Sequence, residues 1–67
     1  MANNFFIKKC KAKTTLGFEV GIEEGVYEVS GDEPEQSAVK LRGKNFYEIK
    51  HTEFQNLKQK NLAVPES

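Results

Sequence analysis

The sequence contains one cysteine, no tryptophan and no long apolar run. The lone Cys10 excludes an intrachain disulfide framework and a zinc site with four cysteine ligands, and it is typical of a reducing, cytoplasmic environment. No segment approaches the roughly 20 apolar residues of a membrane-spanning helix. Lysines follow the first apolar residues, which reverses the order of a signal peptide. We therefore expect a cytoplasmic protein without membrane association.

The chain has only 67 residues, which predicts one domain. Folding at this size buries only about 60% of the surface that the unfolded chain exposes. A deep substrate cleft would remove part of a core that is already thin. The sequence thus favours a binding module over an enzyme, with no cofactor and no small-molecule substrate, as a monomer or a weak homodimer.

Net charge is absent as well, but the charges are segregated. Residues 1–18 carry four lysines and no acid, residues 19–35 seven acids and no base, and residues 36–67 six bases against three acids, which gives +4, −7 and +3. One interpretation is that basic and acidic strands pair across a sheet. The other is a bipolar surface for docking.

Alternation of apolar and polar residues indicates strands over most of the chain. In residues 16–22 every even position is apolar, so we predict one strand with that face buried. Residues 4–13 also favour an extended segment. Its predicted phase has Phe6, Cys10 and Ala12 inward, with Phe5 and Ile7 covering an end of the core. A third strand is expected over 25–30, followed by an acidic loop.

Residues 38–42 and 46–50 predict a hairpin whose register can be derived. A two-residue turn would place Glu48 among core residues, whereas a three-residue loop pairs Val39 with Ile49 and leaves Glu48 outside. Such loops usually end in a left-handed residue, which Asn45 tolerates. We therefore predict the three-residue loop, because a slip by one residue would invert both faces.

The spacing of apolar residues along the chain changes after the hairpin. Thr52 followed by a glutamine three residues later matches a capping box, so we predict a two-turn helix that Thr52 caps and Asn61 closes. Residues 62–67, with Pro65, are expected to form a flexible tail after a single domain over 1–61. The predicted core comprises Leu16, Phe18, Val20, Ile22, Tyr27, Val29, Val39, Leu41, Tyr47, Ile49, Phe54 and Leu57.

Residues 24–54 read as a Gly-x-Tyr-x-Val strand, an alternating hairpin and a short turn ending in phenylalanine. This pattern resembles the small SH3-like barrels of phages and prophages. The resemblance implies an all-β fold with one short C-terminal helix, a small antiparallel SH3-like barrel or strongly bent sheet of about five strands, encoded by a phage or mobile element. The chain lacks the Ala-Leu-Tyr-Asp-Tyr-like strand and the tryptophan of peptide-binding SH3 domains, so proline-motif recognition is not implied.

Few residues are candidates for catalysis or metal binding. Cys10 and His51 are the soft-ligand candidates, and two ligands are too few for zinc. A Cys10–His51 nucleophilic dyad would need an orienting group and an oxyanion site that no motif indicates. The acidic run at residues 32–35 lacks the ligand spacing of a calcium loop. We expect no catalytic residue and no metal site.

The outer face of the hairpin is the predicted interaction site. Its residues are Lys40, Arg42, Lys44, Phe46 and Lys50. An aromatic side chain ringed by cations suits a protein hot spot, and it also suits nucleic acid, where cations meet phosphates and an aromatic ring meets a base. A third interpretation is that Leu62 and Val64, or the N-terminal strand, cover Phe46.

The preferred hypothesis is a non-enzymatic protein that binds and modulates a protein partner. The alternative is a small nucleic-acid-binding barrel that uses the basic hairpin and the lysine-rich N-terminal strand. Zero net charge disfavours nucleic acid. Whether the two basic segments form a stripe free of acids distinguishes the hypotheses.

Overall fold

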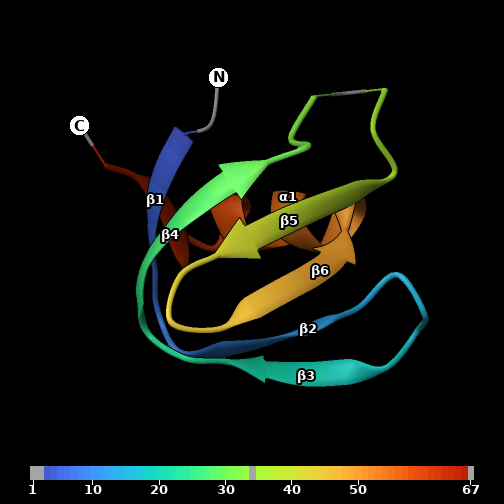
Figure 1. Ribbon diagram of the computed structural model, residues 1–67, viewed down its shortest axis with the longest axis horizontal. Coiled ribbons are helices and arrows are strands. Elements are labelled where there is room, and N and C mark those ends of the chain that lie inside the picture. Colours follow the sequence, from blue (N-terminus) through green and yellow to red (C-terminus); the bar gives the residue numbers. More distant parts are fainter. Residues whose placement is uncertain (1–2, 34, 67) are drawn as a thin grey trace.

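The computed structural model describes residues 3–33 and 35–66. A five-stranded antiparallel sheet in the order β6-β5-β4-β1-β7 packs with a two-stranded β2-β3 sheet and a helix (Figure 1). The predicted all-β fold with one short helix is confirmed. In chain order the elements are β1 (Asn3–Ile7), β2 (Cys10–Lys13), β3 (Glu19–Ile22), β4 (Gly25–Ser30), β5 (Ala38–Arg42), β6 (Phe46–Lys50), α1 (His51–Gln59) and β7 (Ala63–Pro65).

The N-terminal segment is two strands, and its predicted phase is wrong for the first. Phe5 and Ile7 are buried from β1, whereas Phe6 faces outward and is half-buried. Ala12 on β2 is buried and Cys10 packs against the core, as expected. The chain passes from one sheet to the other between β1 and β2, so each strand takes its own inward phase.

The strand predicted over 16–22 begins only at Glu19, because a turn precedes it. The Thr14 N–H donates to the Phe18 carbonyl at 2.7 Å, and the Gly17 N–H donates to the Thr14 carbonyl at 2.9 Å. Gly17 has a φ of 91°, which favours glycine. Leu16 and Phe18 are therefore 82% and 68% exposed, and their predicted place in the core is wrong.

The hairpin has the predicted register. Val39 pairs with Ile49 and Leu41 with Tyr47. The prediction that Asn45 adopts the left-handed conformation is wrong, since the non-glycine residue with positive φ in the described chain is Asn61. Gly43 is required by close packing instead, because a Cβ there would lie 2.9 Å from the Tyr27 ring.

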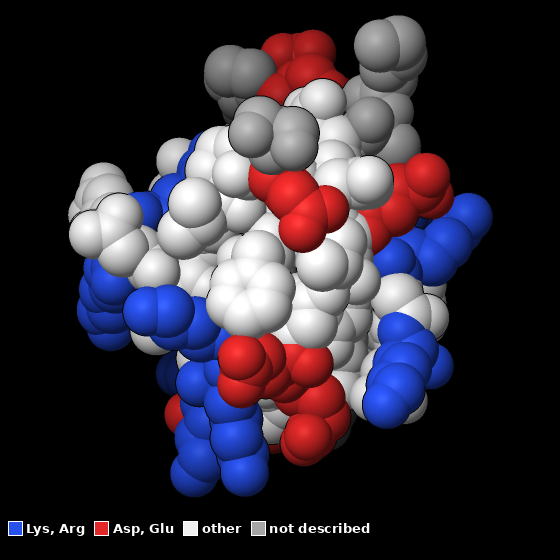
Figure 2. Space-filling view, turned by 90° about the vertical axis from the view of Figure 1, so that its left-hand side faces the viewer, with Lys and Arg blue, Asp and Glu red and all other residues white. Residues whose placement is uncertain are grey.

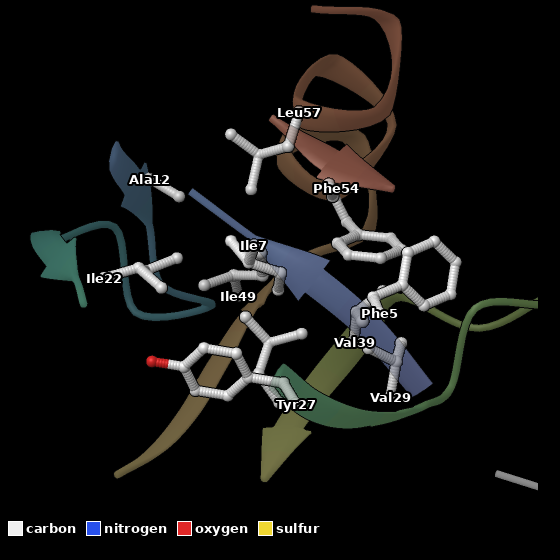
Figure 3. Close-up of a cluster of buried hydrophobic side chains, with 12 residues drawn as sticks. Phe5, Ile7, Ala12, Ile22, Tyr27, Val29, Val39, Ile49, Phe54 and Leu57 are labelled. Carbon is white, nitrogen blue, oxygen red and sulfur yellow. The ribbon is translucent and has the colours of Figure 1, made fainter. Parts of the chain in front are cut away.

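The core lies between the five-stranded sheet, the β2-β3 sheet and α1 (Figure 3). Phe5 meets Phe54 edge to face, with ring centroids 5.2 Å apart. The predicted members from Ile22 onward are buried, except that Tyr47 is half-buried and packs against the cluster; Val20 is half-buried too. The buried residues are Phe5, Ile7, Ala12, Ile22, Tyr27, Val29, Val39, Leu41, Ile49, Phe54, Leu57 and Ala63.

The helix begins two residues earlier than the capping box predicts. Its N-cap is Lys50, which makes no side-chain cap hydrogen bond, so the predicted role of Thr52 is wrong. The His51 N–H donates to the Ser37 carbonyl at 3.2 Å, so the helix follows β6 directly. The Glu53 carboxylate accepts the backbone N–H of Lys13 at 2.9 Å and ties the first turn to β2.

The helix ends in a Schellman motif, and the predicted role of Asn61 is confirmed. Asn61 is left-handed, with a φ of 61°. The Leu62 N–H donates to the Leu57 carbonyl at 2.9 Å, and the Asn61 N–H donates to the Lys58 carbonyl at 3.1 Å. This reversal directs the chain back along β1.

The prediction of a flexible tail is wrong over Ala63–Pro65, which form β7 and pair with β1. Ala63 is buried. Pro65 fits because β7 is an edge strand, where a missing N–H is tolerated. Ser67 lies outside the described residues. In the part of the chain that is described, the helix is too short and too polar to cross a membrane.

Candidate interaction surface

The outer face of the β5-β6 hairpin presents the predicted site residues to solvent. Phe46 is 55% exposed. The register places Arg42 directly opposite Phe46, and the Arg42 guanidinium carbon lies 5.8 Å from the ring centroid. This distance fits a cation–π contact, which is worth about 0.5–1 kcal/mol at an exposed site. The pair forms an exposed, partly apolar surface at the loop end of the hairpin.

The other predicted site residues do not join this pair in one cluster. Lys40 lies opposite Glu48, and Lys50 lies opposite Ala38 at the far end of the hairpin. Lys44 is in the loop and is exposed. The five site residues therefore span the length of the hairpin, and the two among them that form a cation–π contact are Arg42 and Phe46.

Neither the C-terminal segment nor the N-terminal strand covers Phe46. In the five-stranded sheet β6 is at one edge and β7 is at the other, beside β1. Strands β4 and β5 separate β1 from β6. The interpretation that Leu62, Val64 or the N-terminal strand buries Phe46 is therefore wrong.

Cations on this face alternate with carboxylates. Glu28 on β4 lies opposite Arg42, and Glu48 on β6 lies opposite Lys40. The lysines of the N-terminal segment lie after β1 and on β2, and this segment approaches the hairpin at β6, where Thr14 bridges Ile49. The pairing of acidic with basic strands is thus realised on this face, where acids lie opposite both Arg42 and Lys40.

An apolar strip, defined as Phe6, Val26 and Val64, crosses the same outer face. Phe6 pairs with Val26 on one side and with Val64 on the other. Val26 and Val64 are 47% and 41% exposed. Figure 2, which views the side where β1 and β4 lie, shows uncharged surface running between acidic and basic groups.

The apolar strip reaches the hairpin loop. A Cβ at Gly43 would lie 3.0 Å from the Val26 carbonyl oxygen, so the loop passes directly beside β4 at this point. Sequence reasoning missed the strip because its residues come from three strands far apart in the chain. A usable signal was that Val26 is out of phase with the buried Tyr27 and Val29.

A polar cluster fixes the acidic loop to the helix. Asp32 Oδ2 lies 2.9 Å from the Lys58 ammonium, and its Oδ1 accepts the Gln55 amide at 3.2 Å. Nε2 of His51 lies 3.5 Å from the same oxygen. These contacts place His51 in one cluster with Asp32 of the loop and with Gln55 and Lys58 of the helix.

No group of three or more His, Cys, Asp and Glu side chains with metal-binding geometry occurs within residues 3–33 and 35–66. Burial raises the pKa of the Cys10 thiol, which reduces its thiolate fraction at neutral pH. An open hollow of about 540 Å³ lies where β6 meets α1. It is lined by Thr15, Gln36, Ser37, Lys50, His51 and Thr52.

Comparisons of this chain with protein-family models, curated proteins and solved structures found no match.

Proposed function

We propose that this chain is a non-enzymatic interaction protein that binds and modulates a protein partner through the outer face of its five-stranded sheet. The observation that supports the proposal best is the exposed Phe46–Arg42 pair at the end of an apolar strip. Aromatic and arginine side chains dominate the energies of protein interfaces. The likeness to small phage barrels extends the proposal to a phage- or mobile-element-encoded modulator.

Interleaved charges favour a protein partner over nucleic acid. A nucleic-acid surface needs cations free to neutralise phosphates. Here Arg42 faces Glu28 across the sheet, and Lys40 faces Glu48. A partner with matching acidic and basic groups would instead gain specificity from this alternation.

The test is capture of partners from native host lysate on the immobilised chain, with and without nuclease, followed by affinity measurements on the captured partner. Phe46→Ala should weaken binding by about thirtyfold or more, the scale of a lost hot spot. Leu16→Ala is the matched control, because Leu16 is a large apolar residue that is also exposed but lies in the turn before β3. Lys50→Ala should mainly slow association.

Salt dependence identifies the class of partner. Phosphate contacts make log affinity fall linearly with log salt, with a slope near the number of phosphates neutralised. A protein held by Phe46 should show a shallower slope, and its capture should survive nuclease. Capture lost on nuclease treatment, or equal affinity of Phe46→Ala and the unmodified chain, would contradict the proposal.

A further inference from the structure

Strand β3 has an open edge. It pairs with β2 on one side, and among residues 3–33 and 35–66 no strand pairs with its other side (Figure 1). The Thr14 N–H donates to the Phe18 carbonyl, and bonded pairs alternate along an antiparallel ladder. The even-numbered residues of β3 therefore bond to β2, and the backbone N–H and C=O groups of Glu19 and Gly21 point to the open edge.

Gly21, in the middle of this edge strand, has no packing reason to be glycine. A Cβ added there would meet no atom within 4 Å, and its φ is not in the left-handed region. Glycine weakens a strand, and its presence often marks a place where another backbone approaches closely. The exposed backbone of Gly21 is thus available to a further strand.

The apolar face of β3 continues beyond the core. Ile22 is fully buried, Val20 is half-buried and Phe18 is 68% exposed, although all three share one phase. A strand added beside β3 would lie against Val20 and Phe18 on this face. The apolar residues of this alternating segment would then be fully covered only when another strand occupies the open edge.

Charge decides which strand fits. Glu19 on β3 and the two residues that follow the strand, Glu23 and Glu24, are exposed. Antiparallel pairing of two copies about Gly21 would place Glu19 of each copy opposite Glu23 of the other, and like charges directly opposite are destabilising. On its occupied side β3 faces β2, where Lys13 lies opposite Glu19. The same complementarity favours a basic strand on the open side.

We propose that the open edge of β3 binds an extended, lysine- or arginine-bearing segment of a partner protein as an added antiparallel strand. Main-chain hydrogen bonds from Glu19 and Gly21 supply affinity, as in other strand-addition complexes. The basic side chains lie opposite the carboxylates, and alternate apolar side chains lie against Val20 and Phe18. This surface belongs to the β2-β3 sheet and is independent of the Phe46 face.

The experiment titrates the isotope-labelled full chain with a short peptide of alternating lysine and valine, with a glutamate–valine peptide as the charge control. The lysine peptide should shift the amide resonances of Glu19 and Gly21 saturably and slow their hydrogen exchange. Gly21→Pro, which removes the edge N–H, should weaken binding by about tenfold or more, the upper range for one lost hydrogen bond plus the blocking ring. Gly21→Ala should still bind, and Phe46→Ala should bind as the unmodified chain does.

A second variant keeps the test valid if Gly21→Pro fails to fold. Glu19→Lys should reverse the preference from the lysine peptide toward the glutamate peptide. The proposal is overturned if the lysine peptide causes no saturable shift at these amides or shifts the hairpin residues instead. Equal binding of both peptides to the unmodified chain overturns it, and so does self-association through the same amides without peptide.

Discussion

Truncating Ile49 to alanine tests the hairpin register and the thin core together. Ile49 is fully buried. It pairs with Val39 and is bridged on its other side by Thr14. The substitution removes three buried carbons, worth about 2.4 kcal/mol at about 0.8 kcal/mol per methylene. The residual cavity adds about 1 kcal/mol because several elements converge here and collapse is limited.

We therefore expect Ile49→Ala to lower the free energy of unfolding by about 3 kcal/mol. A domain of this size loses roughly 4–8 °C of melting temperature per kcal/mol, so the melting temperature should fall by about 12–24 °C. Chemical denaturation and thermal melting followed by circular dichroism measure both quantities. Phe46→Ala, on the opposite face of β6, is the control and should change stability by less than about 1 kcal/mol. Comparable losses in the two variants would refute the assigned faces.

Two further substitutions test backbone and titration effects. Gly31→Ala should destabilise the protein by about 2 kcal/mol or more, because φ at Gly31 is +83° and a Cβ would lie 2.5 Å from the Ala38 carbonyl oxygen. Gly25→Ala is the control, because a Cβ at Gly25 would meet nothing within 4 Å. In denaturant melts its free energy of unfolding should stay within about 1 kcal/mol of the unmodified chain. Burial raises the pKa of Tyr27, with a smaller contribution from Tyr47. The unfolded chain then loses this proton first, so stability should hold up to about pH 10 and fall above it. Alkaline melts of Tyr27→Phe should show a less steep decline, and an unchanged profile would contradict the assignment.

The predicted interaction site depended on local information. The hairpin loop joins adjacent strands, so loop length and the requirement to bury Val39 and Ile49 together decide the register. That register alone places Phe46 outward and opposite Arg42. The out-of-phase Val26 was a local signal for one member of the apolar strip, but the strip as a whole could not be assembled from the sequence, because Phe6, Val26 and Val64 meet only through pairings between distant segments.

The helix shows a competition between local and tertiary contacts. Thr52 and the glutamine after it satisfy the capping-box pattern, but β6 runs directly into α1 and Lys50 becomes the N-cap. Glu53 then bonds to the backbone of Lys13 on β2, a partner that the local pattern does not contain. The C-terminal end followed the sequence because the left-handed Asn61 needs only the last turn of its own helix.

The sequence by itself determined the strand periodicity from Gly25 onward, the hairpin register and the closing of the helix, since each depends on residues close in the chain. Only the tertiary structure decided that Phe5 and Ile7 are buried, that Leu16 and Phe18 are exposed, and that Ala63–Pro65 form a strand. The physical reason is that alternation fixes which residues share a face but not which face is covered. The covering element comes from elsewhere in the chain, so burial of these segments is a property of the assembled sheets.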